Sequence, residues 1–228
     1  MKIRHEENRK IEFFFNKLYH LFFSEKFFKK INFRFDERGR LDLIKHAIKK
    51  NNYKTYLEIG CHLNEIFDEI KIEKIGVDPV SGGNYRGTSD QFFEENNKKF
   101  DCIFIDGLHT YQQVRKDISN SLKFLNENGL IILHDCLPSS ISRQRVPRTR
   151  YKWNGDVWKA VVETRIKEHL DTYTIIADQG LGIIKKKNNT SILDLGNSKI
   201  QNLKFKYYYY NYQEIMRTIS FEEGLKIV

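Results

Sequence analysis

The chain has 228 residues, of which 40% are hydrophobic, and it carries a formal net charge of +9. This length suits one α/β domain with additions, and the apolar content with only three prolines excludes a disordered or linker-rich chain. The positive charge favours acidic partners such as nucleic acid, anionic lipid or a phosphorylated substrate, although a solvated basic surface explains it equally well.

The cysteine content and the N-terminus bear on location. The three cysteines show no Cys-x-x-Cys spacing, which predicts a reduced protein. The N-terminal stretch lacks the apolar core and the small-residue cleavage site of a signal peptide. No window reaches the roughly 18 uncharged apolar residues of a membrane-spanning helix. We therefore expect a cytoplasmic location and no transmembrane segment.

The first predicted element is a Phe-rich helix over residues 10–31, where aromatic residues recur at helical spacing. The segment 1–35 has three interpretations: a helical cap over an acceptor site, a homodimer interface, or a helix lying on an anionic membrane. Its phenylalanines extend far around the helix, which favours a cap or a dimer interface. A second helix is predicted over residues 37–50, with Asp36 as its cap.

From residue 54 onward, short apolar runs alternate with helical patterns. The predicted strands cover residues 55–60, 73–78, 100–106 and 129–135. The predicted helices of this region cover residues 110–126 and 156–170, and a closing antiparallel hairpin covers residues 172–187. Such strands indicate a parallel sheet that is covered on both faces. The tail, residues 188–228, begins as a loop and ends in one or two helices.

The four predicted strands end in Gly60, Asp78, Asp106 and Asp135. Ligands of an open parallel sheet bind beyond the carboxyl ends of its strands, so these residues define one rim. Glu58 and Gly60 open a turn in which the backbone comes close to a ligand, and Asp78, 20 residues after Glu58, is placed to accept ribose hydroxyls. The turn lacks the Gly-x-Gly-x-x-Gly pattern that binds a pyrophosphate. This favours a nucleoside cofactor without one, such as S-adenosylmethionine.

The stretch after the second strand supports a nucleoside site. Asp90 can accept from the amine of an adenine, and Ser89 offers a hydroxyl. The same stretch, beginning at Thr88, also reads as a helix cap with its first turn, and both interpretations can hold at once. The predicted cofactor-binding residues are Glu58, Gly60, Cys61, His62, Asn64, Asp78, Thr88, Ser89, Asp90 and Asp106.

Six stretches together resemble a bacterial class I S-adenosylmethionine-dependent methyltransferase: YLEIGC, IGVDP, GTSDQFF, FDCIFIDGLHTYQQVRKDI, LNENGLIILHDCLP and WNGDVWKAV. The resemblance covers about residues 36–187 and is closest to the branch associated with surface-polysaccharide and secondary-metabolite O-methylation. It implies a Rossmann-like, mostly parallel seven-stranded sheet with helices on both faces and a C-terminal antiparallel hairpin. The chain departs from the family at Asn64, where glycine is usual. Because asparagine tolerates a left-handed backbone, cofactor binding is expected to survive.

The predicted catalytic residues are Asp106, His109, His134 and Asp135. Methyl transfer to a hydroxyl needs an oriented acceptor and the removal of its proton. Either His109 or His134 is a general base near its ordinary pKa, or Asp106 and Asp135, with His134, hold Mg²⁺ or Mn²⁺. Related magnesium-dependent methyltransferases place acidic residues at these strand ends, but His134 stands where a second carboxylate is frequent. A structural role for His134 alone, through backbone hydrogen bonds, is also open.

A basic loop follows the fourth strand, and its predicted acceptor-binding residues are Arg143, Arg145, Arg148 and Arg150. Arginine matches phosphate and carboxylate, which predicts a small anionic acceptor such as a phosphorylated or nucleotide-linked sugar or a surface-glycan precursor. The alternative is a solvated, mobile lid. Trp153 and Trp158 are expected to pack rather than to bind the acceptor.

Two other functions stay open. An RNA or other nucleic-acid methyltransferase fits the charge, but the sequence lacks an Asn-Pro-Pro-aromatic motif and an RNA-binding module, so no stable nucleic-acid complex is expected. A non-catalytic cofactor-binding scaffold is the second alternative, and the acidic rim with His109 argues against it.

Overall fold

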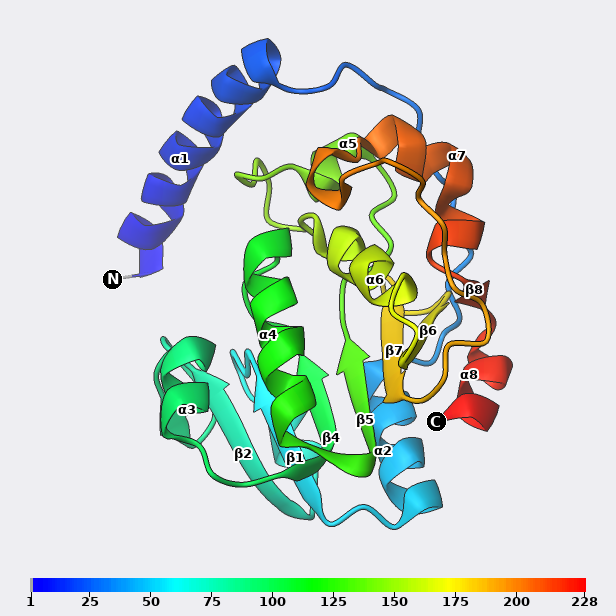
Figure 1. The fold of residues 1–228 in the computed structure, drawn as a ribbon. Coiled ribbons are helices and arrows are strands. Elements are labelled where there is room, and N and C mark those ends of the chain that lie inside the picture. The colour runs from blue at the N-terminus through cyan, green and yellow to red at the C-terminus, as the bar shows by residue number, and fades with distance from the viewer. Residues whose placement is uncertain (1) are drawn as a thin grey trace.

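A computed structural model describes residues 2–228, with side chains from residue 9 onward. Its strands are β1 (Thr55–Ile59), β2 (Glu73–Asp78), β3 (Tyr85–Arg86), β4 (Phe100–Ile105), β5 (Leu125–Leu133), β6 (Leu170–Ile175), β7 (Leu181–Lys186) and β8 (Thr218–Ile219). They form one eight-stranded sheet in the order β3-β2-β1-β4-β5-β7-β6-β8 (Figure 1). The strands from β3 to β5 pair in parallel, while β7 is antiparallel to both β5 and β6. The predicted α/β class, with its closing hairpin, is confirmed.

Helices cover both faces of this sheet (Figure 1). The helices are α1 (Lys2–Phe23), α2 (Arg40–Asn51), α3 (Ser89–Glu95), α4 (Tyr111–Phe124), α5 (Ile141–Gln144), α6 (Val157–Arg165), α7 (Phe205–Ile215) and α8 (Phe221–Ile227), with short 3₁₀ turns at Phe67–Glu69 and Ile200–Asn202. Helices α3, α4, α6 and α7 pack on one face, and α2 and α8 pack on the other.

The central strands are apolar along their whole length because both of their faces are buried. On β4, Ile103 and Ile105 lie in the core beneath α4, while Cys102 and Phe104 lie in the core beneath α2. Side chains of a strand alternate between the faces of its sheet, so a strand between two helical layers has no solvent side. All three cysteines are free and buried.

Several element boundaries differ from those predicted. The resemblance implied seven strands, and the sheet has eight, of which β3 and β8 are two-residue strands at its edges. The strand predicted over 129–135 already begins at Leu125, and the helix predicted over 156–170 ends at Arg165. Strand β8 belongs to the C-terminal tail and pairs with β6, so the tail takes part in the sheet.

The Phe-rich helix predicted over residues 10–31 ends at Phe23. Beyond it the chain is irregular, because Phe27 packs against Phe205 and Tyr209 of α7, with ring centroids 5.9 and 5.1 Å away. The Ile31 N–H then donates to a loop carbonyl at 2.9 Å. Aromatic contacts to a distant helix therefore override the local helical spacing.

The start of α2 also differs from the prediction. The helix begins at Arg40, and its N-cap is Gly39 rather than Asp36. The Asp36 carboxylate instead accepts from the backbone and the side chain of Arg38. This later start places Arg40 in the first turn, facing the sheet. Within residues 2–228, no helix combines the length and the apolarity that crossing a bilayer requires.

Candidate active site

The aspartates predicted at the ends of β4 and β5 lie side by side. The two strands pair in parallel up to Ile105 and Leu133, so the residues that follow leave the sheet at the same edge. Nδ1 of His134 lies 3.2 Å from Oδ1 of Asp106 and 3.5 Å from Oδ2 of Asp135. The structure thus brings these three predicted site residues together.

His109 sits between the same two aspartates. Its Nε2 lies 3.1 Å from Oδ1 of Asp106, and its Nδ1 lies 3.1 Å from Oδ2 of Asp135 and 3.0 Å from the carbonyl oxygen of Trp153. Carboxylate and carbonyl oxygens only accept, so both ring nitrogens carry protons in this arrangement. Burial lowers the pKa of His109, but Asp106 and Asp135 outweigh it and raise the pKa above its ordinary value. The pKa of His109 thus lies above the ordinary value on which the sequence prediction relied, and its role as a base stays a prediction.

The turn from Trp153 to Gly155 holds His109 in place, and sequence analysis did not assign it this role. The Trp153 ring stacks on the imidazole with centroids 5.5 Å apart, and Nδ2 of Asn154 donates to Oδ1 of Asp135 at 2.8 Å. Gly155 has φ 62°, and a Cβ there would lie 1.6 Å from the carbonyl oxygen of His109. Only glycine fits that contact. The stretch was part of the resemblance, but its position 44 residues from His109 gave no sign of the contact.

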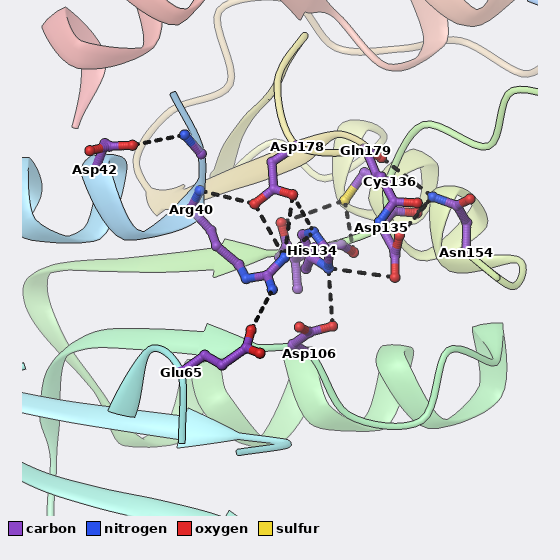
Figure 2. Close-up of polar contacts among 12 residues, drawn as sticks. Arg40, Asp42, Glu65, Asp106, His134, Asp135, Cys136, Asn154, Asp178 and Gln179 are labelled. Carbon is purple, nitrogen blue, oxygen red and sulfur yellow. Dashed lines mark hydrogen bonds and ion pairs between the residues drawn. The ribbon is translucent and has the colours of Figure 1, made fainter. Parts of the chain in front are cut away.

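Two more charged residues that sequence analysis missed complete the cluster (Figure 2). The backbone N–H of Arg40 donates to Oδ2 of Asp178 at 3.1 Å, and the guanidinium Nη1 donates to the same oxygen at 3.2 Å. Oδ1 of Asp178 lies 3.3 Å from Nε2 of His134. Burial would raise the pKa of Asp178, but His134 and Arg40 lower it to about 2. Neither residue stands at a strand end of the predicted rim, so no local pattern indicated that they belong to the site.

The two ring nitrogens of His134 face groups of opposite charge: Nδ1 faces the Asp106 carboxylate, and Nε2 faces the Arg40 guanidinium. Burial lowers the pKa of His134, and the nearby carboxylates of Asp106, Asp135 and Asp178 raise it well above its ordinary value. Nη1 of Arg40 lies 2.8 Å from Nε2, and a guanidinium can only donate. This shorter contact requires the neutral tautomer with its proton on Nδ1, toward Asp106. The ring can take a second proton only if Arg40 moves.

The fixed charges of the cluster do not balance. Three carboxylates, those of Asp106, Asp135 and Asp178, face one guanidinium, that of Arg40, so two negative charges remain without a partner. The second proton of His109 offsets one of them while His134 stays neutral, and a divalent cation beside neutral imidazoles would offset both. Asp106, His134 and Asp135 offer ligand atoms that all lie within 4.8 Å of one another, so this donor set fits a metal ion once Nδ1 of His134 has lost its proton.

A cavity of about 270 Å³ opens at the carboxyl ends of β1 and β4. Its lining includes Arg40, Glu58, Gly60, Cys61, His62, Asp106 and His109. Gly60 has φ 90°, and a Cβ there would lie 2.2 Å from the carbonyl oxygen of Asp106, so only glycine lets the two strand ends approach. Glu58 accepts from the Tyr56 hydroxyl at 2.7 Å, and burial raises its pKa to about 7. The lining therefore places the carboxyl groups of Glu58 and Asp106 beside the basic groups of Arg40 and His109.

Asp78 ends β2 as predicted, and its carboxylate is bound to backbone. Oδ2 accepts from the N–H of His62 at 3.0 Å, and Oδ1 accepts from those of Val80 and Ser81 at 2.8 Å each. Burial raises the pKa of Asp78, but these three donors lower it overall. The carboxylate thus fixes the turn after β1 to the loop after β2, and its contact with a ribose stays a prediction.

Asn64 adopts the left-handed backbone that the sequence predicted, with φ 64°. Its Oδ1 accepts from the N–H of Gly83 at 2.7 Å, so the side chain makes a contact that glycine could not make. Among the described residues, the segment from Gly60 to β2 contains a 3₁₀ turn and no α-helix.

The stretch from Thr88 to Asp90 confirms the helix-cap interpretation. Thr88 caps α3 through a capping box with Gln91. The hydroxyl of Ser89 is buried and donates to Oδ1 of Asp117 at 2.6 Å, and Asp90 pairs with a lysine of α4 at 3.2 Å. All three side chains are occupied within the protein, and their contact with an adenine stays a prediction.

The predicted acceptor-binding arginines lie in α5 and the loop after it. Nη1 of Arg143 donates to Oε1 of Gln179 at 2.9 Å, beside Asp178, and the guanidinium of Arg148 lies 5.7 Å from the Trp153 ring. The four arginines are Arg143, Arg145, Arg148 and Arg150, and within residues 9–228 none of them forms an ion pair with a carboxylate. Burial lowers the pKa of the first three. Unpaired, partly buried guanidinium groups favour a bound anion.

Residues 47–136 match the family model described as a methyltransferase domain. A protein from Staphylococcus aureus described as a caffeoyl-CoA O-methyltransferase superposes with a TM-score of 0.50 at 22% identity, covering 68% of this chain and 86% of that one. The chain has the methyltransferase fold. An S-adenosylhomocysteine-bound methyltransferase from Podospora anserina also gives a TM-score of 0.50, at 15% identity over 79% of this chain and 88% of that one. The comparison with curated proteins gives no match.

We predict that replacing Arg40 by methionine lowers the free energy of unfolding by about 3 kcal/mol, because the largely buried carboxylates lose their cation. Urea unfolding near neutral pH measures this loss. Arg38→Met is the matched control: that side chain is 40% exposed and pairs with Asp36 and Glu222 at the surface, so its loss should cost less than about 1 kcal/mol. Equal losses in the two variants would contradict a stabilising role for Arg40 in the cluster.

A second prediction concerns pH and Glu58. The pKa of its carboxyl rises from 4.5 to about 7 on folding, so the folded chain holds the proton more tightly. This stabilisation is fully present below the unfolded pKa and is lost as the pH rises through the folded pKa. Wild type should therefore lose stability relative to Glu58→Gln between about pH 5 and pH 8, by roughly 1.4 kcal/mol per unit of pKa difference. Urea midpoints of both proteins measure it, and parallel curves would show that Glu58 does not titrate there.

Proposed function

We propose that the protein transfers a methyl group from S-adenosylmethionine to a hydroxyl oxygen of a small anionic acceptor. One observation carries the proposal. The hydrogen-bonded pair Asp106 and His109 forms part of the wall of the cavity at the ends of β1 and β4. The methyltransferase fold and the family match over residues 47–136 support the same chemistry.

The residues of the cavity suit this cofactor. When bound, S-adenosylmethionine supplies an activated methyl group on a cationic sulfonium. Asp106, and Glu58 above its pKa of about 7, provide negative charge along the cavity wall, and Gly60 keeps the space between the two strand ends free of a side chain. The turn tied down by Asp78 and Asn64 is held rigid for the nucleoside part. We assign cofactor binding to these residues.

Asp106, His109 and Asp135 act on the acceptor. Asp106 and Asp135 fix the His109 ring from both of its nitrogens, so the ring can orient an acceptor hydroxyl and take its proton once it has lost one of its own. The alternative role for Asp106, Asp135 and His134 is to hold a divalent cation, which would acidify the acceptor hydroxyl.

Arg143, Arg145 and Arg148, which are partly buried, are the reason for proposing an anionic acceptor. Unpaired guanidinium groups beside Gln179 and Trp153 suit a phosphate or a carboxylate. We propose a phosphorylated or nucleotide-linked sugar, or a surface-glycan precursor, as the acceptor. The three free cysteines support a cytoplasmic location.

We predict that Asp106→Asn, His109→Gln and Asp135→Asn each lower kcat by about 100-fold. Calorimetry should find the affinity for S-adenosylmethionine changed much less in His109→Gln and Asp135→Asn, because these two groups act on the acceptor, whereas Asp106→Asn also removes charge from the cofactor cavity. Transfer of a labelled methyl group to sugar nucleotides, glycans and tRNA identifies the acceptor and measures kcat. Asp68→Asn, on an exposed carboxylate, is the control.

The two mechanisms give opposite results in the same assay. If a metal is used, EDTA abolishes transfer and Mg²⁺ or Mn²⁺ restores it. If His109 is the base, EDTA has no effect and kcat rises with pH through a value above the ordinary 6.5 of histidine. Cofactor binding without transfer to any acceptor would make the protein a scaffold, and transfer to tRNA alone would make it an RNA methyltransferase.

A further prediction concerns the basic loop. Replacing Arg143, Arg145 and Arg148 by glutamine should raise the KM for the acceptor at least about tenfold, because charge-assisted contacts are lost, and should flatten its salt dependence. Affinity for the cofactor should not change. The control variant, Lys123→Gln, Lys167→Gln and Lys187→Gln, removes the same charge from exposed sites away from the cavity. An unchanged KM in the arginine variant would reduce the loop to a solvated lid.

A further inference from the structure

Helix α1 contacts the rest of the protein along one narrow stripe. Within residues 9–23 only Phe13 and His20 are buried. Nδ2 of Asn16 donates to the carbonyl of Arg148 at 2.8 Å, and Nε2 of His20 lies 2.7 Å from that of Pro147. Spacings of three and four residues put Phe13, Asn16 and His20 on one side of the helix.

The opposite side of α1 is apolar and exposed. Ile11, Phe15, Leu18 and Phe22 follow one another at four- and three-residue spacing and are 57%, 62%, 40% and 74% exposed. At 3.6 residues per turn this stripe lies across the helix from His20. Figure 1 shows α1 at the edge of the molecule, with no other element on its outer side. Soluble proteins seldom expose so continuous an apolar face without a binding role.

The charges of this segment are nearly all positive. Residues 9–35 contain seven lysines and arginines and two glutamates. At helical spacing Lys10 and Lys17 lie along one side of the apolar face. The other basic residues are Arg9 and, beyond the helix end, Lys26, Lys29, Lys30 and Arg34. None of the seven forms an ion pair with a carboxylate among the side chains that the structure describes. An apolar face with lysines beside it complements the anionic surface of a bilayer.

The same charges disfavour a second copy of the chain as the occupant. Two such helices face to face would bring two positively charged borders together, and like charges across an interface cost free energy. In the sequence, the wide distribution of phenylalanines around α1 favoured a cap or a dimer interface. The structure offers another explanation: the side with Phe13, Asn16 and His20 packs on the protein, so only the remaining sides meet solvent or a partner.

We propose that α1 lies on an anionic lipid surface, with Ile11, Phe15, Leu18 and Phe22 in the headgroup region. Phe23, the last residue of the helix, and Phe28, beyond its end, are also exposed, by 75% and 83%. Such a helix lies in the plane of the interface and does not cross the bilayer. This inference does not depend on the proposed methyl transfer.

Vesicle flotation with the full chain tests the proposal. The protein should bind vesicles containing about 30% anionic phospholipid and should not bind neutral phosphatidylcholine vesicles, and added salt should weaken binding. Phe22→Ser should reduce binding at least about tenfold, because a buried phenyl ring is lost from the headgroup region. The matched control is Ile192→Ser, on a side chain that is 53% exposed elsewhere, and it should bind as wild type does.

A second variant tests the charges alone. Lys10→Gln, Lys17→Gln and Lys26→Gln together should weaken binding about 100-fold, roughly fivefold for each lysine. The variant Lys123→Gln, Lys167→Gln and Lys187→Gln, with the same net charge, should bind almost normally. Absence of binding to anionic vesicles, or equal binding by Phe22→Ser, would overturn the proposal. A dimer in light scattering that Phe22→Ser dissociates, without vesicle binding, would assign the face to a second copy.

Discussion

Asp106, Asp135 and Asp178 converge on two imidazoles and one guanidinium in a largely buried space. An unpaired carboxylate there would cost several kcal/mol, so the fold is stable only when its counter-charges reach the same point. Arg40 arrives from the first turn of α2, and Asp178 arrives from the turn between β6 and β7 (Figure 2). The antiparallel placement of β7 beside β5 is what brings that turn to the ends of the parallel strands.

The same cluster connects the loop that carries the arginines to the histidine. Arg148 packs over Trp153, Trp153 stacks on His109, and Asn154 holds Asp135. The loop and the imidazole therefore share their structural support. Orientation supplies a large part of the rate in a displacement reaction, so in the methyl transfer that we propose these contacts would couple acceptor binding to catalysis.

The rim of the site was predictable because it follows from local pattern and one topological rule. Continuous apolar runs gave the parallel strands, and parallel strands end at one edge, so Asp106 and Asp135 were expected together. Arg40 and Asp178 were not predictable. Their meeting depends on where α2 and the β6–β7 turn pack, and nothing in either local sequence encodes that contact.

Local pattern also failed where distant contacts were stronger. The aromatic spacing of the N-terminal segment predicts a helix beyond Phe23, but Phe27 has α7 as a partner and leaves the helix. The stretch at Ser89 reads as polar and available, yet Asp117, 28 residues later, takes its hydroxyl. Tertiary packing decides such positions, and one sequence does not report it.

The bond between Arg40 and Asp178 joins residues that are 138 positions apart. During synthesis the ribosome releases the parallel strands first, so the carboxylates at their ends are made before Asp178. Docking of β7 then brings the last carboxylate to a guanidinium and an imidazole that precede it in the chain. A chain that stops before the hairpin thus lacks the acidic partner that Arg40 and His134 share, as well as part of the sheet. The charge cluster is therefore one of the last features of the fold to be completed.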